Sequence, residues 1–199
     1  LIVPQGWGSR GALGKIRAIQ IARENKIPYL GLCYGMQMAV IEYARNVLGL
    51  KDANSQEVNP KSKNLVIHLM EDQKKILKDG KYGGTIRLGA WPCKIKKGSL
   101  LESLYKKYPN ELFNTLPTVQ ERHRHRYEFN NVYAKELQKA GLILSGKSPN
   151  GKLIEAIELS SKKHPFFVAT QYHPELKSRF LSPHPLFLGF LDATIKKKV

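Results

Sequence analysis

Cys33 lies between Gly31 and Gly35 in a Gly-x-Cys-x-Gly pattern. The apolar run 27–32 predicts a short buried strand, and the spacing of apolar residues over 36–48 predicts an amphipathic helix. Such a sharp strand-to-helix turn presents a nucleophile at the tip of a sheet, and side chains on the glycines would collide there. A helix N-terminus also favours the thiolate. The alternative is a buried structural cysteine.

A base and an orienting carboxylate follow the last apolar strand, predicted over 166–172. Pro174 cannot continue a ladder of hydrogen bonds, so His173 and Glu175 should lie in the turn after the strand. A reactive thiol needs a base for its proton and a third group that orients the base. Cys33, His173 and Glu175 can fill these roles in a hydrolase or amide transferase that passes through a thioester. The three residues alone do not separate a cysteine protease from an amidotransferase, and a surface histidine is the alternative for His173.

The glycine-rich stretch 4–11, which contains Gly6, follows a short apolar opening. It does not match a Walker phosphate loop, because Ser9 replaces a required glycine and Ile16 follows Lys15. Its N–H groups could instead form an oxyanion hole, and a plain connecting loop is the alternative.

The order of strand, loop, helix (15–25) and strand (27–32) predicts a βαβ unit with parallel strands and a right-handed crossover. Sites in such α/β sheets form beyond the carboxyl ends of the strands, where both the Gly6 loop and Cys33 should lie. Further strands are predicted over 142–145 and 153–159, and a helix over 186–195 should pack on the sheet.

The 199 residues, 42% of them hydrophobic, predict a single domain over 1–199. Two cysteines favour a reducing, cytoplasmic setting over a disulfide framework. No stretch has the length of a membrane span, and no signal peptide opens the chain, so no membrane partner is expected. The opening residues resemble the end of a buried strand, so we expect the chain to be cropped from a longer protein.

The net charge of +17 raises the possibility of nucleic-acid binding. The basic residues are mainly lysines scattered over predicted loops and the C-terminus, without interleaved aromatic residues, which favours a solvated surface and makes nucleic acid an unlikely partner.

Residues 121–130 have an alternating pattern of charge. With the two-residue period of a strand, one face carries arginines and the other two histidines and a tyrosine. The arginines are Arg122, Arg124 and Arg126, and the opposite face carries His123, His125 and Tyr127. The guanidinium groups argue against a metal site, and both anion capture and nucleic-acid contact remain open.

Residues 31–37 and 171–175 resemble the two signatures of class I (triad) glutamine amidotransferase domains. Several further runs narrow the resemblance to the glutaminase domain of CTP synthase: 4–11, 44–55, 83–89 and 122–130. The resemblance implies a three-layer, flavodoxin-like α/β fold, with a mostly parallel central sheet flanked by helices and a few antiparallel strands.

The activity that the resemblance implies is hydrolysis of the glutamine side-chain amide to glutamate and ammonia through a glutamyl thioester. Cys33 would be the nucleophile, with His173 and Glu175 completing the triad. Gly6 would belong to the glutamine-binding and oxyanion loop, and the N–H of Tyr34 would complete the hole.

Four further positions match glutamine-binding residues of the family: Gln37, Glu57, Arg126 and Tyr127. Opposite charges suit a free amino acid, so Glu57 should pair with its α-ammonium and Arg126 with its α-carboxylate.

The family's ammonia passes to an N-terminal synthetase domain that uses ATP to phosphorylate UTP and then aminates it to CTP. This chain contains no candidate for that domain, so no cofactor is expected here. ATP and Mg would belong to the synthetase domain, and GTP is a possible effector. The resemblance further implies strand–helix units before the Gly6 loop, and a tetramer only for the full-length enzyme.

The chain departs from the family pattern near this loop, where Gln5 replaces a glycine, Trp7 a phenylalanine and Tyr34 a common leucine. Gln5 could strain the loop or narrow the glutamine pocket. A catalytically impaired regulatory or interaction domain is therefore the main alternative, and a basic nucleic-acid-binding module is a further one.

Overall fold

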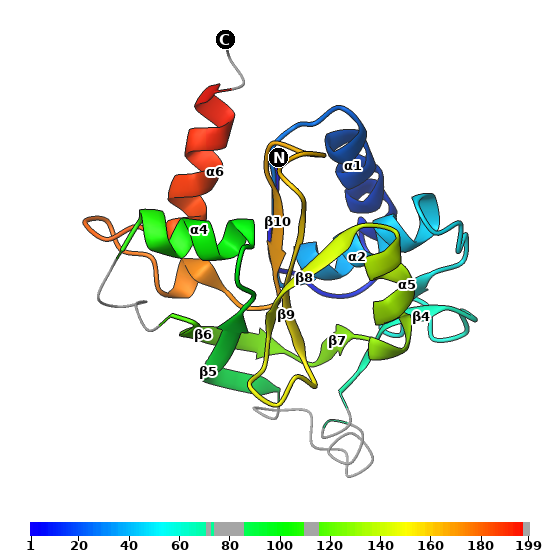
Figure 1. Ribbon diagram of the computed structural model, residues 1–199. Coiled ribbons are helices and arrows are strands. Elements are labelled where there is room, and N and C mark those ends of the chain that lie inside the picture. The colour runs from blue at the N-terminus through cyan, green and yellow to red at the C-terminus, as the bar shows by residue number, and fades with distance from the viewer. Residues whose placement is uncertain (71–72, 74–85, 110–115, 197–199) are drawn as a thin grey trace.

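The computed structural model describes residues 1–70, 73, 86–109 and 116–196 (Figure 1). A seven-stranded sheet forms the centre of this part of the protein. In spatial order its strands are β1 (Ile2–Val3), β2 (Tyr29–Leu32), β10 (Phe167–Thr170), β9 (Ile154–Leu159), β8 (Leu142–Lys147), β5 (Arg87–Ile95) and β6 (Thr118–His125). A smaller sheet contains β3 (Asn54–Ser55), β4 (Leu65–Leu69) and β7 (Tyr127–Phe129).

The parallel part of the large sheet is β1-β2-β10, as the predicted βαβ unit requires. Thr170 of β10 pairs with Leu32 of β2, so both strands end at the same edge. The two segments that follow them begin with Gln171 and Cys33, which the parallel register brings side by side. From β10 to β6 the neighbouring described strands are antiparallel, a larger antiparallel share than the sequence suggested.

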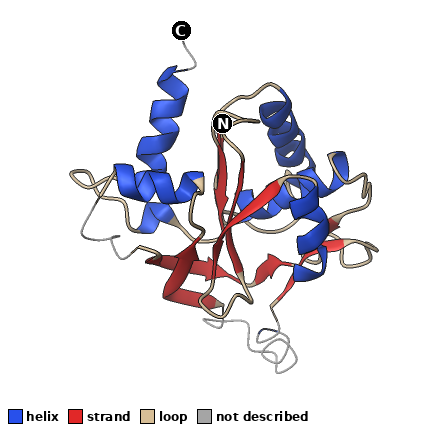
Figure 2. Ribbon diagram, in the orientation of Figure 1, coloured by secondary structure: helices blue, strands red, loops and turns tan. Residues whose placement is uncertain are grey.

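Helices cover both faces of the sheet, giving three layers (Figure 2). The helices are α1 (Ala12–Glu24), α2 (Tyr34–Asn46), α4 (Leu100–Lys107), α5 (Ala134–Lys139) and α6 (Pro185–Lys196), with short 3-10 turns η1 (Asn131–Tyr133) and η2 (Pro174–Leu176). One hydrophobic core lies under α1, α2 and α5, and a second under α4 and α6. The prediction that the C-terminal helix packs on the sheet is confirmed through Leu186, which is fully buried in the second core.

Helix α2 differs from the amphipathic helix predicted over 36–48. It begins directly after Cys33, at Tyr34, and every residue from there to Ala44 is buried. The helix is enclosed because it packs against α1 on one side and against β2, β4 and β10 on others. The spacing of apolar residues in the sequence therefore predicted only one of the buried faces of this helix.

Helix α1 begins at Ala12 rather than at the predicted Lys15. The apolar spacing also predicts that Ile21 faces the core, but its side chain is exposed. The sequence also predicts a strand over 85–89 and another around Cys93. Residues 87–89 and Cys93 belong to one strand, β5, whereas residue 85 lies outside the described residues. The sequence further predicts a lysine-rich surface excursion over 71–82. This segment and the adjoining Gly83-Gly84 lie outside the described residues, apart from residue 73.

Candidate active site

The predicted elbow is present between β2 and α2. Cys33 has φ 51° and ψ −97°, a conformation that costs about 1–3 kcal/mol for a residue other than glycine. A Cβ on Gly31 would lie 2.8 Å from the Cβ of Ala169, and one on Gly35 would lie 2.1 Å from the carbonyl oxygen of Val3. Both glycines are therefore required by close packing, as the sequence predicted.

His173 and Glu175 lie in the turn after β10. Nδ1 of His173 is 2.7 Å from Oε1 of Glu175, so the proton of the neutral ring resides on Nδ1, since the carboxylate can only accept. Nε2 of His173 is buried and has no hydrogen-bond partner among the described residues. This tautomer leaves Nε2 as a base.

Strand β6 brings the base and the thiol to one place. The backbone N–H of His173 donates to the carbonyl of Arg122 at 2.8 Å, and Sγ of Cys33 lies 4.0 Å from the carbonyl oxygen of Arg124. The N–H of Cys33 donates to the carbonyl of Thr170, three residues before His173. The structure thus gathers the three predicted triad residues at one sheet edge.

The environment of Cys33 opposes a free thiolate. Burial raises the pKa of its thiol to about 12, and the negative charge of Glu175 adds to the increase. The backbone N–H of Tyr34 and the side-chain amide of Gln171 act in the other direction, because they hydrogen-bond to the sulfur. A thiol of this kind requires a neighbouring base to react near neutral pH.

The glycine-rich loop before α1 is held by one contact with the elbow and one with Glu57. The hydroxyl of Tyr34 donates to the carbonyl of Gly8, and the N–H of Gly8 donates to Oε1 of Glu57 at 3.1 Å. Gly6 lies against the Tyr34 ring, since a Cβ on Gly6 would be 3.5 Å from Cδ1 of that ring. The side chain of Gln5 is exposed, and its φ is not positive, so it introduces no backbone strain of that kind.

Glu57 and Arg126, predicted to bind the two charged groups of glutamine, are close enough to influence each other. Burial raises the pKa of Glu57, whereas the N–H of Gly8 and the positive charge of Arg126 lower it. The two residues provide opposite charges beside the loop, as selection of a free amino acid requires.

Gln37 and Tyr127 are linked to the thiol through the side chain of Gln171. Nε2 of Gln37, a buried residue of α2, is 3.1 Å from the carbonyl oxygen of Tyr127 and 3.3 Å from Oε1 of Gln171. Nε2 of Gln171 in turn lies 3.5 Å from Sγ of Cys33. The structure therefore brings both predicted residues to the site, with the amide nitrogen of Gln37 directed at protein acceptors.

The two faces predicted for residues 122–127 are confirmed over 122–125, where both histidines are buried and both arginines are exposed. The alternation does not extend to Arg126 and Tyr127, which are both half-buried, because β6 ends at His125. His123, His125 and Glu155 have a spacing that could hold a metal ion. However, Nη1 of Arg87 lies 3.2 Å from each histidine, and the guanidinium makes a bidentate pair with Glu155 at 3.1 and 2.8 Å. A cation already occupies the centre of the cluster, and burial lowers the pKa of both histidines, which keeps them neutral.

Sequence reasoning missed three contributors to the site. Gln171 belongs to the family signature at 171–175, but only the pairing of β10 with β2 shows that its side chain reaches the thiol. Gly8, rather than Gly6, supplies the N–H bonded to Glu57. Arg87 carried no sequence signal, because its partners lie far along the chain.

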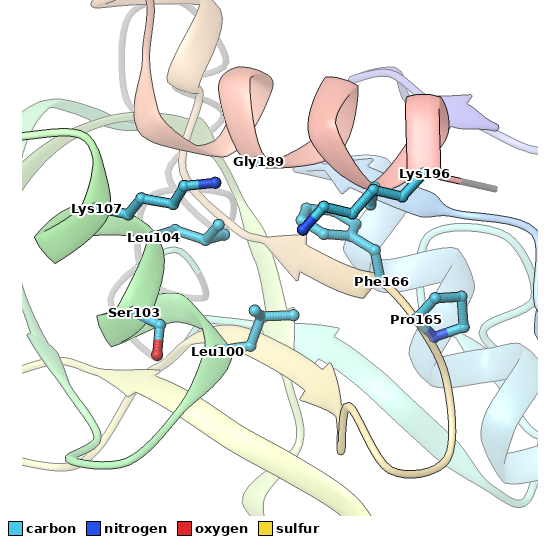
Figure 3. A pocket seen from close by; sticks show the side chains of 9 residues that line it. Leu100, Ser103, Leu104, Lys107, Pro165, Phe166, Gly189 and Lys196 are labelled. Carbon is cyan, nitrogen blue, oxygen red and sulfur yellow. The ribbon is translucent and has the colours of Figure 1, made fainter. Parts of the chain in front are cut away.

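A cavity of about 360 Å³ lies away from these residues, between α4 and α6 (Figure 3). Its lining is mainly apolar and includes Leu100, Leu104 and Phe166, with Lys107 and Lys196 beside them. The described residues that line it include no cysteine, histidine or carboxylate. Among the described residues, no helix is long and apolar enough to cross a membrane.

An elbow thiol whose base follows the neighbouring parallel strand is the arrangement of class I glutamine amidotransferases. The chain belongs to this family: the family model described as "Glutamine amidotransferase class-I" matches residues 1–193. The predicted family, fold class and enzyme class are thereby confirmed.

Two curated relatives are CTP synthases. That of Caldanaerobacter subterraneus subsp. tengcongensis is 58% identical over 199 residues, and that of Carboxydothermus hydrogenoformans is 54% identical over 196 residues. These matches cover 100% and 98% of this chain but 34% of each relative. The chain therefore spans about a third of the relatives' length.

A solved structure also resembles the chain closely: "Trypanosoma brucei CTPS - glutaminase domain with bound acivicin". It has a TM-score of 0.85 and 41% sequence identity, and the match covers 98% of this chain and 70% of that one. The resemblance to a CTP synthase glutaminase domain inferred from the sequence is confirmed.

Proposed function

We propose that this chain hydrolyses the side-chain amide of glutamine to glutamate and ammonia. The observation that carries the proposal is the His173–Glu175 pair, whose 2.7 Å hydrogen bond leaves Nε2 of the histidine available at the sheet edge where Cys33 also lies. A histidine held in this tautomer can take a proton from a neighbouring thiol and return it to a leaving group.

In the proposed reaction, Nε2 of His173 removes the thiol proton and Sγ of Cys33 attacks the amide carbon. The N–H groups of Tyr34 and Gly6 stabilise the oxyanion. Collapse of the tetrahedral adduct breaks the C–N bond, and His173 protonates the departing nitrogen to release ammonia. Water, deprotonated by the same histidine, then cleaves the thioester to yield glutamate and the free thiol.

Recognition of glutamine rests on charge. Glu57 would accept hydrogen bonds from the α-ammonium, and the guanidinium of Arg126 would bind the α-carboxylate. The mutual influence of these two charges supports one amino-acid site between them. Gln37 and the backbone of Tyr127 would complete the wall behind the thiol.

We further propose that the ammonia serves amination of UTP to CTP by a synthetase domain. The relatives' name supports this role, as does the share of their length that the chain matches. ATP and Mg would act in that domain, GTP would be an effector, and tetramer formation would belong to the full-length enzyme.

The test is release of ammonia and glutamate from glutamine by Cys33→Ala, with Cys93→Ala as the matched control. Both thiols are buried, but Cys93 lies in β5 with its sulfur against Gly146, away from the elbow. We expect activity to disappear in the first variant and persist in the second. Turnover that survived in Cys33→Ala would remove Cys33 from the mechanism.

A further inference from the structure

Gln171 is the residue after β10, and its side chain is fully buried. Its backbone N–H donates to the carbonyl of Glu155 at 2.8 Å, which fixes the main chain at this point. Nε2 of its side chain lies 3.5 Å from Sγ of Cys33, within reach of a hydrogen bond to sulfur. None of the triad steps uses this amide.

The orientation of the Gln171 amide follows from its neighbours rather than from atom labels. The carbonyl of Tyr127 can only accept a hydrogen bond, so the amide of Gln37 must direct its nitrogen there. The same nitrogen then reaches the amide of Gln171, which must offer its oxygen. The remaining group of Gln171, its N–H, consequently faces Cys33.

The carbonyl at the start of this chain of contacts is itself held in place. Nδ1 of His125 lies 3.0 Å from the carbonyl oxygen of Tyr127, so this ring nitrogen carries the proton and Nε2 accepts. Nε2 is 3.2 Å from Nη1 of Arg87, which is paired with the buried Glu155. A buried ion pair, five contacts from the thiol, therefore holds in place the carbonyl that sets the orientation of the two amides.

We propose that Gln171 is a further catalytic residue, which donates an N–H to the thiolate of Cys33, and that Gln37 is a positioning residue that selects the required orientation of its amide. The inference rests on the proposed function. Its chemical reason is that a hydrogen bond to an ionised sulfur is stronger than one to a neutral thiol. The contact therefore favours the state reached when His173 takes the proton.

The other groups around the sulfur show why a donor is needed. Glu175 in η2 and Glu57 after β3 both disfavour negative charge on Cys33. The carbonyl of Arg124 in β6 directs its oxygen at the sulfur. His173 becomes cationic only when it has taken the proton. Among the described residues, the Gln171 amide and the backbone N–H of Tyr34 donate hydrogen bonds to the sulfur.

The experiment measures the rate at which iodoacetamide alkylates Cys33 as a function of pH, with mass spectrometry locating the adduct. Gln171→Met keeps the side-chain length without the donor. We expect its pH midpoint to rise by about one unit and its rate below the midpoint to fall about tenfold. Gln171→Glu still accepts from Gln37 but directs a carboxylate at the sulfur, so its midpoint should rise at least as far.

Gln37→Met tests the positioning role. Because Gln37 acts through Gln171, its loss should raise the midpoint in the single variant and add nothing in the Gln37→Met/Gln171→Met double variant. Gln138→Met, on the exposed face of α5, is the matched control and should leave the midpoint unchanged.

An unchanged midpoint in folded Gln171→Met or Gln171→Glu, checked by thermal melting, would refute the catalytic role of the amide. Fully additive shifts in the double variant would refute the positioning role of Gln37. Alkylation needs no glutamine turnover, so the readout stays valid if the chain fails to release ammonia. Such a failure would count against the proposed function and not against the contact with the thiol.

Discussion

Replacing Gly35 by alanine would place a methyl group where the backbone of β1 now lies. The ideal Cβ would be 2.1 Å from the carbonyl oxygen and 3.1 Å from the carbonyl carbon of Val3. Both partners are backbone atoms, so no side-chain rotation can relieve the overlap. Val3 pairs with Gly31 in β2, and the glycine-rich loop starts directly after it.

The cost can be estimated from what must move. Helix α2 and β1 have to separate by roughly 1 Å, and overpacking of this kind typically costs about 1–3 kcal/mol. Weakening the β1–β2 pairing adds about 1 kcal/mol per lost hydrogen bond, and the higher helix propensity of alanine returns about 1 kcal/mol. With one hydrogen bond lost, we expect a net destabilisation of about 1–3 kcal/mol, or a fall of roughly 2–12 °C in Tm for a chain of this length.

Thermal unfolding of Gly35→Ala and of a matched control, Gly14→Ala, measures this effect. Gly14 is also in a helix, α1, but a Cβ there meets nothing within 4 Å. The control should keep or raise Tm, by up to about 1 kcal/mol in stability. Equal Tm values for wild type and Gly35→Ala would refute the claim that close packing of the elbow requires this glycine.

Three further variants and one pH profile test the loop contacts, Glu57 and the buried ion pair. Tyr34→Phe removes the hydroxyl bonded to the carbonyl of Gly8, so steady-state kinetics should show a KM for glutamine about three- to tenfold higher; an unchanged KM would mean that this contact does not order the loop. Glu57→Gln should raise KM about ten- to a hundredfold. Because burial raises the pKa of Glu57, KM of the wild type should also rise as pH falls through that raised pKa, and a parallel rise in the variant would exclude Glu57 as the cause. Glu155→Gln leaves the buried guanidinium of Arg87 without its anionic partner, so denaturant unfolding should show a loss of about 3–5 kcal/mol, and a loss below 1 kcal/mol would contradict this view of the ion pair.

Local chemistry was readable from the sequence wherever neighbours in the chain are also neighbours in space. The Gly-x-Cys-x-Gly pattern predicted the elbow, because the collisions that exclude a side chain at Gly31 and Gly35 involve a turn of only a few residues and the strands beside it. Pro174 correctly placed His173 and Glu175 outside the last strand, although β10 already ends at Thr170 rather than at the predicted residue 172. The period of two along β6 correctly separated exposed arginines from buried histidines.

Helix α2 shows where a one-dimensional pattern was insufficient. Its spacing indicated a single apolar face, but burial on all sides depends on strands from three separate parts of the chain. The sequence also did not predict how many strands are antiparallel, because the spacing of apolar residues does not determine strand direction. Direction is set by the connections between strands beyond the first βαβ unit.

The sequence by itself identified the family and predicted a nucleophile, its base and an orienting carboxylate, because these residues lie in short runs whose geometry is local. Only the tertiary structure decided which atoms those runs present to one another. It placed the amide of Gln171 at the sulfur, tied the loop at Gly8 to Glu57, and filled the histidine cluster with the guanidinium of Arg87. These contacts join residues up to 138 positions apart, and side-chain orientation over such separations depends on strand register and packing rather than on local propensity.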